Sequence, residues 1–185
     1  MKLTQYLFIG VIAFICFPTM AADHSKDNEA LNHLYTQFSL AFKQLDASVF
    51  EQVYAIDACY IPEQQGKEIT MGRENIVALY SKFFGKIKHK KATIEVDFRV
   101  IERQFDSQSA TDVGYYLVRF YPAKDTEEPM SEFAGKFVNV ANKDSEGQWH
   151  LRVDTSNRSE PTFYFKAKPS PNLYYGSQFA PVQSE

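Results

Sequence analysis

Cysteine is scarce in this 185-residue chain, which has two, and only Cys59 lies beyond the apolar N-terminal stretch. Without a second partner there, no intramolecular disulfide can form, so hydrophobic packing must hold the fold together. Histidine is also scarce, and no pair of His, Cys or carboxylate side chains has the spacing of metal ligands. The sequence therefore gives no support for a metal site, and no pattern in it points to a cofactor.

A strong positive charge and a long apolar run are missing too. The formal net charge is −3, which provides no overall field to attract nucleic acid. No stretch reaches the roughly 20 apolar residues that a membrane-spanning helix needs. We therefore expect no nucleic acid partner and no membrane span.

The first 21 residues have the order of a secretory signal. Lys2 provides one positive charge, an apolar run covers residues 6–17, and a small residue follows at Ala21. This order predicts a signal peptide over residues 1–21 that is removed on export. We therefore expect the mature protein to be periplasmic or secreted.

The first half of the remaining chain has helical periodicity. Apolar residues recur every three or four positions over residues 28–45, which predicts a long amphipathic helix. A short helix is expected over residues 49–54, and a short strand over residues 59–61. A third helix is expected to begin at Gly72 and to end at Gly85, a common helix stop. Its expected buried stripe is Ile76, Leu79, Tyr80 and Phe83.

The second half changes to the alternation that is typical of strands. Residues 94–100 alternate between apolar and charged, which predicts a strand with one wet face. Residues 113–121 are apolar or aromatic on both faces, which favours a central strand. Two more strands are expected over residues 132–141 and 148–154. Helices followed by an antiparallel meander predict an α+β fold, with the helices packed on one face of a curled sheet.

Several short motifs occur in a recognisable order. They are Leu45-Asp46, Tyr54 with Asp57-Ala58, Gly72 with Ile76, Gly135 with Phe137, and Gly147-Gln148-Trp149 leading to Asp154. This order resembles the nuclear transport factor 2-like superfamily, which includes ketosteroid isomerase and the SnoaL-like polyketide cyclases. The resemblance implies a domain over residues 28–157, in which a curved antiparallel sheet forms a cone around the N-terminal helices. It also implies a mostly apolar pocket and, frequently, a homodimer through the outer face of the sheet.

The catalytic positions of this superfamily fall on residues that cannot abstract a proton. The resemblance places the tyrosine of the isomerase at Phe38, its aspartate base at Pro62 and its third polar group near Asn139. A histidine that many relatives carry on the last strand falls at Val153. The sequence therefore favours ligand binding without catalysis.

Two carboxylates are the remaining catalytic candidates. Glu63 lies one residue beyond the base position, although a glutamate in such a loop is more often exposed to solvent. Asp154 is expected to share a strand face with Arg152, where the two could hold a polar ligand group or form an ordinary surface pair. An enzyme would need one carboxylate inside the cone with a shifted pKa.

Aromatic residues are abundant, at 15%, and supply the expected pocket wall. The predicted pocket residues are Phe38, Tyr60, Tyr80, Tyr116, Phe137, Asn139, Trp149 and Val153. A wall of this kind suits binding of a small, largely apolar molecule better than proton transfer. Two other functions stay open: an isomerase-like or SnoaL-like enzyme acting on a small hydrophobic substrate, and a dimeric module that binds another protein.

A dense group of lysines lies at the end of the third expected helix. Its members are Lys82, Lys86, Lys88, Lys90 and Lys91. The group is dense enough to attract anions, but its location also has a structural reason, because cations complement the dipole at a helix C-terminus. No aromatic side chains are interleaved with it on a sheet face, as single-stranded nucleic acid would need.

The last residues, 158–185, form an arm rich in proline and aromatic side chains. Its prolines forbid a continuous helix, while its aromatic residues are too apolar for a freely solvated tail. We expect residues 162–167 to pack as an extended edge segment and the rest to lie as a strap. A strap across the mouth of the cone would act as a lid.

Overall fold

The computed structural model describes residues 23–182, and the expected signal peptide over residues 1–21 lies outside this range. The helices are α1 (Ser25–Gln44), the 3-10 helix η1 (Ala47–Val49), α2 (Phe50–Val53), α3 (Arg73–His89) and α4 (Pro161–Lys166). The strands are β1 (Tyr54–Ile61), β2 (Thr70–Met71), β3 (Thr93–Phe105), β4 (Ser109–Tyr121), β5 (Ser131–Lys143) and β6 (Trp149–Ser159).

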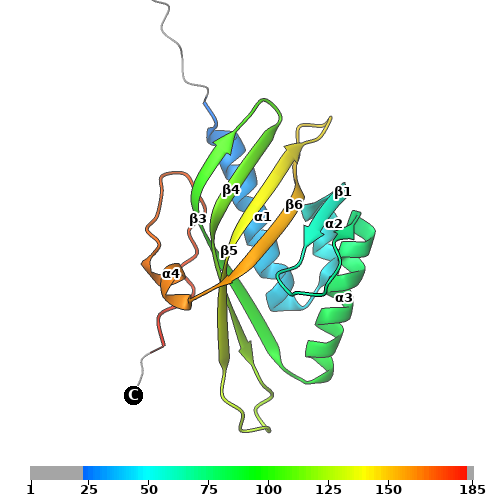
Figure 1. Ribbon diagram of the computed structural model, residues 1–185, viewed down its shortest axis with the longest axis vertical. Coiled ribbons are helices and arrows are strands. Elements are labelled where there is room, and N and C mark those ends of the chain that lie inside the picture. Colours follow the sequence, from blue (N-terminus) through cyan, green and yellow to red (C-terminus); the bar gives the residue numbers. More distant parts are fainter. Residues whose placement is uncertain (1–22, 183–185) are drawn as a thin grey trace, which may run out of the picture.

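The six strands form one curved sheet in the order β2-β1-β6-β5-β4-β3 (Figure 1). Strands β3 to β6 make the expected antiparallel meander, whereas β1 pairs with β6 in parallel. The α+β class with a curved sheet is confirmed, but the sheet is mixed rather than wholly antiparallel. The reason is that no hairpin joins β1 to β6, so the tight turn that enforces antiparallel pairing is missing at this edge.

Helix α1 lies against one face of the sheet, which we call the inner face. Its apolar stripe is buried as the periodicity predicts, through Leu31, Leu34, Tyr35, Phe38, Ala41 and Phe42. These side chains pack with the inward residues of the strands and with α3 in one core. Within residues 23–182, no helix is both long and apolar enough to cross a membrane.

Helix α3 continues through Gly85 to His89, so the expected end at Gly85 is wrong. Phe84 and Ile87, on either side of this glycine, are buried in the core. Their packing outweighs the roughly 1 kcal/mol that a glycine costs inside a helix. As a result, Lys82 and Lys86 stand one turn apart on a single regular helix.

The C-terminal arm covers the opposite, outer face of the sheet. Residues 161–166 form α4, so the expected extended edge segment is wrong. Pro161 occupies the start of this helix, where its missing N–H is not needed. Tyr164 is fully buried in a second small core with Leu117, Ala134 and Phe179.

The remainder of the arm runs along the free edge of β3. The Val100 amide donates to the Tyr174 carbonyl (2.9 Å), and the Gly176 amide donates to the Phe98 carbonyl (2.7 Å). Figure 1 shows the arm and α3 on opposite sides of the sheet. The arm therefore forms a strap, but it protects a sheet edge and the outer face.

Candidate ligand cavity

A row of four polar side chains crosses the inner face of the sheet. Arg103 on β3 lies opposite Asp112 on β4. Asp112 lies opposite Asn139 on β5, which in turn lies opposite Asp154 on β6. All four residues are buried. Strand register therefore brings together side chains that are up to 51 positions apart in the chain.

The Arg103 end of this row is closed by paired charges. Arg103 donates through Nε and Nη2 to the two carboxylate oxygens of Asp112, at 2.7 Å each. The Tyr35 hydroxyl donates to the same carboxylate at 2.8 Å. We interpret this buried pair as structural, because the charge of Asp112 is balanced by Arg103 and both carboxylate oxygens already accept hydrogen bonds.

The Asp154 end depends on a bulge in β6. Val140 lies opposite Val153 and Ala141 lies opposite Leu151, so Arg152 is one residue extra on β6. The extra residue reverses the alternation: Asp154 joins the buried face of Leu151, while Arg152 is exposed. The expectation that Asp154 and Arg152 share a face is therefore wrong. Arg152 forms its ion pair with Asp57 instead (3.0 Å), with both side chains more than half exposed.

Asp154 is held by neutral groups. The Tyr54 hydroxyl donates to its Oδ2. With the Asn139 amide turned so that its nitrogen faces acceptors, Nδ2 donates to Asp154 Oδ1 at 3.3 Å and to the Val138 carbonyl at 3.2 Å. Burial raises the pKa of Asp154 to about 6, and the hydrogen bond from Tyr54 offsets this only in part. The carboxyl group therefore changes charge close to neutral pH.

Three tyrosines surround this carboxyl group. Burial raises the pKa of Tyr54, Tyr60 and Tyr80, and the negative charge of Asp154 raises each pKa further. The rings of Tyr60 and Tyr80 lie 6.0 Å apart. All three phenols are therefore neutral at physiological pH. Tyr54 already gives its one O–H to Asp154, whereas Tyr60 and Tyr80 can each donate to a further acceptor.

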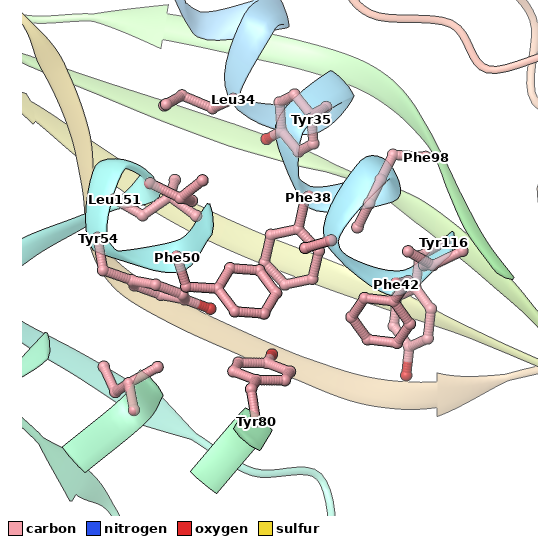
Figure 2. Close-up of a cluster of buried hydrophobic side chains, with 14 of the residues drawn as sticks. Leu34, Tyr35, Phe38, Phe42, Phe50, Tyr54, Tyr80, Phe98, Tyr116 and Leu151 are labelled. Carbon is pink, nitrogen blue, oxygen red and sulfur yellow. The ribbon is translucent and has the colours of Figure 1, made fainter. Parts of the chain in front are cut away.

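Asp154, Tyr60 and Tyr80 line one end of a cavity of about 870 Å³ between α3 and the inner face. Its walls are mainly apolar, and include Phe38, Phe42, Val96, Phe98, Val118 and Phe137. Figure 2 shows Phe38 and Phe42 of α1 gathered with Tyr80 of α3 and Tyr116 of β4. We call the Asp154 end the inner end, and the end with the exposed lining residues Lys67, Glu68, Lys82 and Lys86 the mouth.

A second carboxylate, Glu63, lines the cavity from the loop after β1. Its Oε2 accepts from the Tyr116 hydroxyl (2.8 Å), and its Oε1 pairs with Arg158 Nε (2.8 Å). The side chain of Glu63 is only 8% exposed. The interpretation of Glu63 as an exposed loop residue is therefore wrong, because two partners on β4 and β6 draw it inward.

Gly135 provides the room that this arrangement needs. It lies opposite Tyr116 in the β4–β5 pair. A Cβ atom at this position would stand 2.3 Å from Cε1 of the Tyr116 ring, closer than atoms can approach. The phenol therefore lies across β5 where any other residue would displace it. This explains a glycine in the middle of a long strand.

Comparison with known proteins rests on structure, because no protein-family model and no curated protein matches the sequence. A nuclear transport factor 2-like superfamily protein from Salmonella enterica superposes with a TM-score of 0.58 at 13% identity, over 74% of this chain and 93% of that one. Kfla4162 from Kribbella flavida gives 0.65 at 14% identity, over 75% and 94%. A ketosteroid isomerase-like protein from Erwinia carotovora gives 0.56 at 14% identity, over 75% and 98%. The chain has the nuclear transport factor 2-like fold.

Within this nuclear transport factor 2-like fold, most of the residues expected at the pocket line the cavity. They are Phe38, Tyr60, Tyr80, Tyr116, Phe137 and Asn139. Pro62 at the base position of the resemblance and the two catalytic candidates, Glu63 and Asp154, also line the cavity. Trp149 and Val153 are not among the lining residues. The Trp149 indole packs near Phe105 and donates to Asp27 Oδ1 (2.9 Å). The bulge at Arg152 sets Val153 on the opposite face from Asp154.

The bulge also decides which residue in this part of β6 reaches the cavity. The expected position is Val153, but the next residue, Asp154, is the one that reaches the cavity. No signal in the sequence of β6 alone reveals this, because the bulge arises from its pairing with β5. Among residues 23–182, no group of three or more metal-binding side chains comes together.

The arm contributes no lining residue among the part of the chain that the structure describes. The strap does not cross the mouth of the cavity, so the condition for a lid is not met: the arm packs on the outer face, while the cavity lies on the inner one. The loop between β1 and β2 borders the cavity instead, through Pro62, Glu63, Gln64, Lys67 and Glu68.

Proposed function

We propose that the protein binds a small, largely apolar molecule in the cavity. The observation that carries this proposal is a cavity of about 870 Å³ that opens to solvent at its mouth and is lined further in by aromatic side chains of the core. Ligand pockets in proteins commonly measure 300–1,000 Å³ and have apolar walls with a few placed polar groups.

The polar groups at the inner end would orient the ligand. Tyr60 and Tyr80 are neutral donors, and Asp154 can accept or donate a hydrogen bond according to its protonation. A ligand with one carbonyl or hydroxyl group on an apolar body would satisfy these groups, which otherwise face a largely apolar space.

The test uses N-phenyl-1-naphthylamine, a neutral apolar dye that fluoresces in apolar surroundings. We expect saturable binding with one site per chain. The Ala78→Trp variant places an indole on the cavity wall, and we expect it to raise Kd at least about tenfold, equivalent to about 1.4 kcal/mol. The matched control is Ala30→Trp, at an exposed position of α1 outside the cavity. Equal affinity in both variants would place the dye elsewhere and refute the proposal.

A second candidate function is proton transfer by Asp154. The specific observation in its favour is a cavity carboxyl group whose pKa is about 6, close to the value that a general base needs at neutral pH. The neighbouring neutral tyrosines could donate to a developing oxyanion. The ketosteroid isomerase-like description belongs to a structural neighbour, and we extend it to this chain only as this second candidate.

This second candidate is tested by hydrogen exchange at the carbon next to the carbonyl group of apolar ketones. The exchange is followed by NMR in deuterium oxide. Catalysis should rise as pH passes about 6 and should vanish in Asp154→Asn, while dye binding persists. Binding of the ketones without any exchange above the buffer rate would leave the protein a binder and exclude this activity.

We also propose that the protein is exported and forms a homodimer. Export rests on the signal pattern of residues 1–21 and the dimer on the resemblance. Because the arm covers the outer face around Leu117 and Ala134, the two chains of a dimer would have to meet outside that area. Expression of the full chain in a bacterial host, followed by fractionation and N-terminal sequencing, should find a mature chain in the periplasm that begins near Ala22. Light scattering measures the oligomeric state. A cytoplasmic, uncleaved chain or a monomer would refute the corresponding proposal.

A further inference from the structure

The lysine group at the end of α3 divides into two sets in the structure. Lys82 and Lys86 line the cavity mouth, whereas Lys88, Lys90 and Lys91 do not line it. Lys67, from the loop between β1 and β2, joins the first set. Cations therefore reach the mouth from two separate elements, although the sequence shows only one cluster.

The two lysines of α3 belong to a stripe that follows the cavity. Asn75, Ala78, Leu79, Lys82, Phe83 and Lys86 recur at the three- and four-residue spacing of one helix face. The helix dipole accounts for basic residues in the last turn. It does not account for Lys82, which lies seven residues before the helix ends at His89.

The acidic residues of the cavity do not neutralise these lysines. Glu63 already pairs with Arg158. Over residues 23–182, none of Lys67, Lys82 and Lys86 forms an ion pair. The one other carboxylate at the mouth is Glu68, against three lysines. The mouth is therefore locally positive on a chain whose net charge is −3.

The positive mouth and the carboxyl group of Asp154 lie at different ends of the cavity. Tyr80, whose pKa is raised by the charge of Asp154, precedes Lys82 by two residues and Lys86 by six, or about 3 Å and about 9 Å along a helix. On β6, Arg158 is a further cavity-lining cation with a side chain 58% exposed, and it lies four residues beyond Asp154, or about 13 Å along a strand. Apolar side chains such as Val96, Val118 and Phe133 line the cavity wall.

We propose that the ligand is an amphipathic anion, with an apolar body in the cavity and a carboxylate, sulfonate or phosphate group at Lys67, Lys82 and Lys86. This inference rests on the proposed function and adds the chemical class of the ligand. The anionic group stays in the solvated mouth, where its desolvation cost is small and three cations attract it. The uncharged end of the ligand reaches Tyr60 and Tyr80.

The test compares two dyes with the same aromatic frame. N-phenyl-1-naphthylamine is neutral, and 8-anilino-1-naphthalenesulfonate carries one added sulfonate. We expect the wild type to bind the sulfonate dye about tenfold more tightly than the neutral dye at low salt, and this preference to shrink as salt screens the mouth. Ala78→Trp should weaken both dyes, which shows that they share the cavity.

Two double variants then test the lysines. Lys82→Gln/Lys86→Gln should weaken binding of the sulfonate dye about fivefold and leave the neutral dye within twofold, because exposed ion pairs contribute modestly. Lys88→Gln/Lys90→Gln removes the same charge from the same end of the helix outside the cavity. This control should leave both dyes within twofold.

The outcomes separate this inference from the proposed function. The anionic ligand would be overturned, and the binding function kept, if the cavity binds the neutral dye as tightly as the sulfonate dye. The same holds if both double variants lose equal affinity for the sulfonate dye. If Ala78→Trp changes the affinity for neither dye, both the anionic ligand and the proposed binding function are overturned.

Discussion

Two buried aspartates, one on each face of the sheet, have opposite surroundings. Asp97 on the outer face accepts hydrogen bonds from the Phe98 and Gln178 amides and from the Tyr164 and Tyr174 hydroxyls, at 2.9–3.3 Å. Asp154 on the inner face has Tyr54 and Asn139 as partners and lines a cavity. Burial raises the pKa of both carboxyl groups, but only Asp154 has space beside it for another molecule.

Arg99, which is also buried on the outer face, is bound by the arm as well. Its guanidinium lies between the rings of Tyr164 and Tyr175, at 4.2 and 4.4 Å, and donates to the carbonyls of Tyr164 and Gly176. The arm thus supplies hydrogen-bond partners to both Asp97 and Arg99. Burial alone therefore does not identify a functional carboxylate. The two features that distinguish Asp154 from Asp97 are the smaller number of donors bound to it and the open volume beside it.

The largest expected effect comes from removal of the arm. Truncation after Ser159 removes Tyr164 and Phe179, two buried aromatic side chains that contribute about 1.5–3 kcal/mol each. We expect the free energy of unfolding in urea to fall by about 4 kcal/mol. Neutral dye affinity in the cavity should stay within twofold. Unchanged stability would mean that the arm does not pack on the outer face in solution.

The next effect is expected at Asp97. In Asp97→Asn an amide nitrogen replaces one oxygen and faces donors rather than acceptors. Although burial raises the pKa of Asp97, we expect a loss of about 3 kcal/mol in the free energy of unfolding, because the new amide nitrogen leaves two of the four donors without an acceptor. Urea unfolding at pH 8 measures it. A neutral or stabilising result would contradict the structural role of this carboxylate.

At Asp154 the same substitution should have the opposite sign. The folded pKa of about 6 lies above the ordinary value of 3.8, so between these pH values the folded chain holds a proton that the unfolded chain has lost. The stabilising contribution of this proton is complete below about pH 4 and disappears as pH rises through 6. Above pH 6 the buried charge costs about 3 kcal/mol, because the folded and ordinary pKa values differ by about two units and each unit corresponds to about 1.36 kcal/mol.

We therefore expect Asp154→Asn to stabilise the protein at pH 8 by about 2 kcal/mol and to have little effect below pH 4. Asn139 can turn its amide to accept from the new nitrogen. Denaturant unfolding across pH 3–8 gives the difference between wild type and variant, in which the contribution of Asp97 cancels. A variant that is less stable than the wild type at pH 8 would show that the ionised carboxylate supports the fold.

The smallest expected effect lies at Gly135. Gly135→Ala should cost about 1–2 kcal/mol, because its Cβ meets the Tyr116 ring and must displace it. The displaced phenol should also weaken dye binding. Gly85→Ala is the matched control: its Cβ meets nothing within 4 Å, and it should stabilise α3 by about 1 kcal/mol. Equal effects of the two substitutions would mean that Tyr116 does not occupy the space over Gly135.

Sequence by itself determined the features that follow from local periodicity. The apolar stripe of residues 28–45 required a helix with one buried face, and the alternation of residues 94–100 required a strand. The motif order led to the fold, and the excess of aromatic residues led to Phe38, Tyr60, Tyr80, Tyr116 and Phe137 on the cavity wall. Each of these signals is carried by neighbours along the chain, so one sequence suffices to show it.

Only the tertiary structure decided which polar groups reach the cavity. Where β5 and β6 pair at Arg152, β6 has one residue more than β5, and this bulge turns Asp154 inward. The alternation of β6 alone predicts the opposite orientation. Glu63 is drawn inward by partners 53 and 95 residues away. Gly85 stays helical because the packing of Phe84 and Ile87 against distant residues outweighs local propensity. Cross-strand register and long-range contacts join residues that are far apart in the chain, which is why no local pattern shows them.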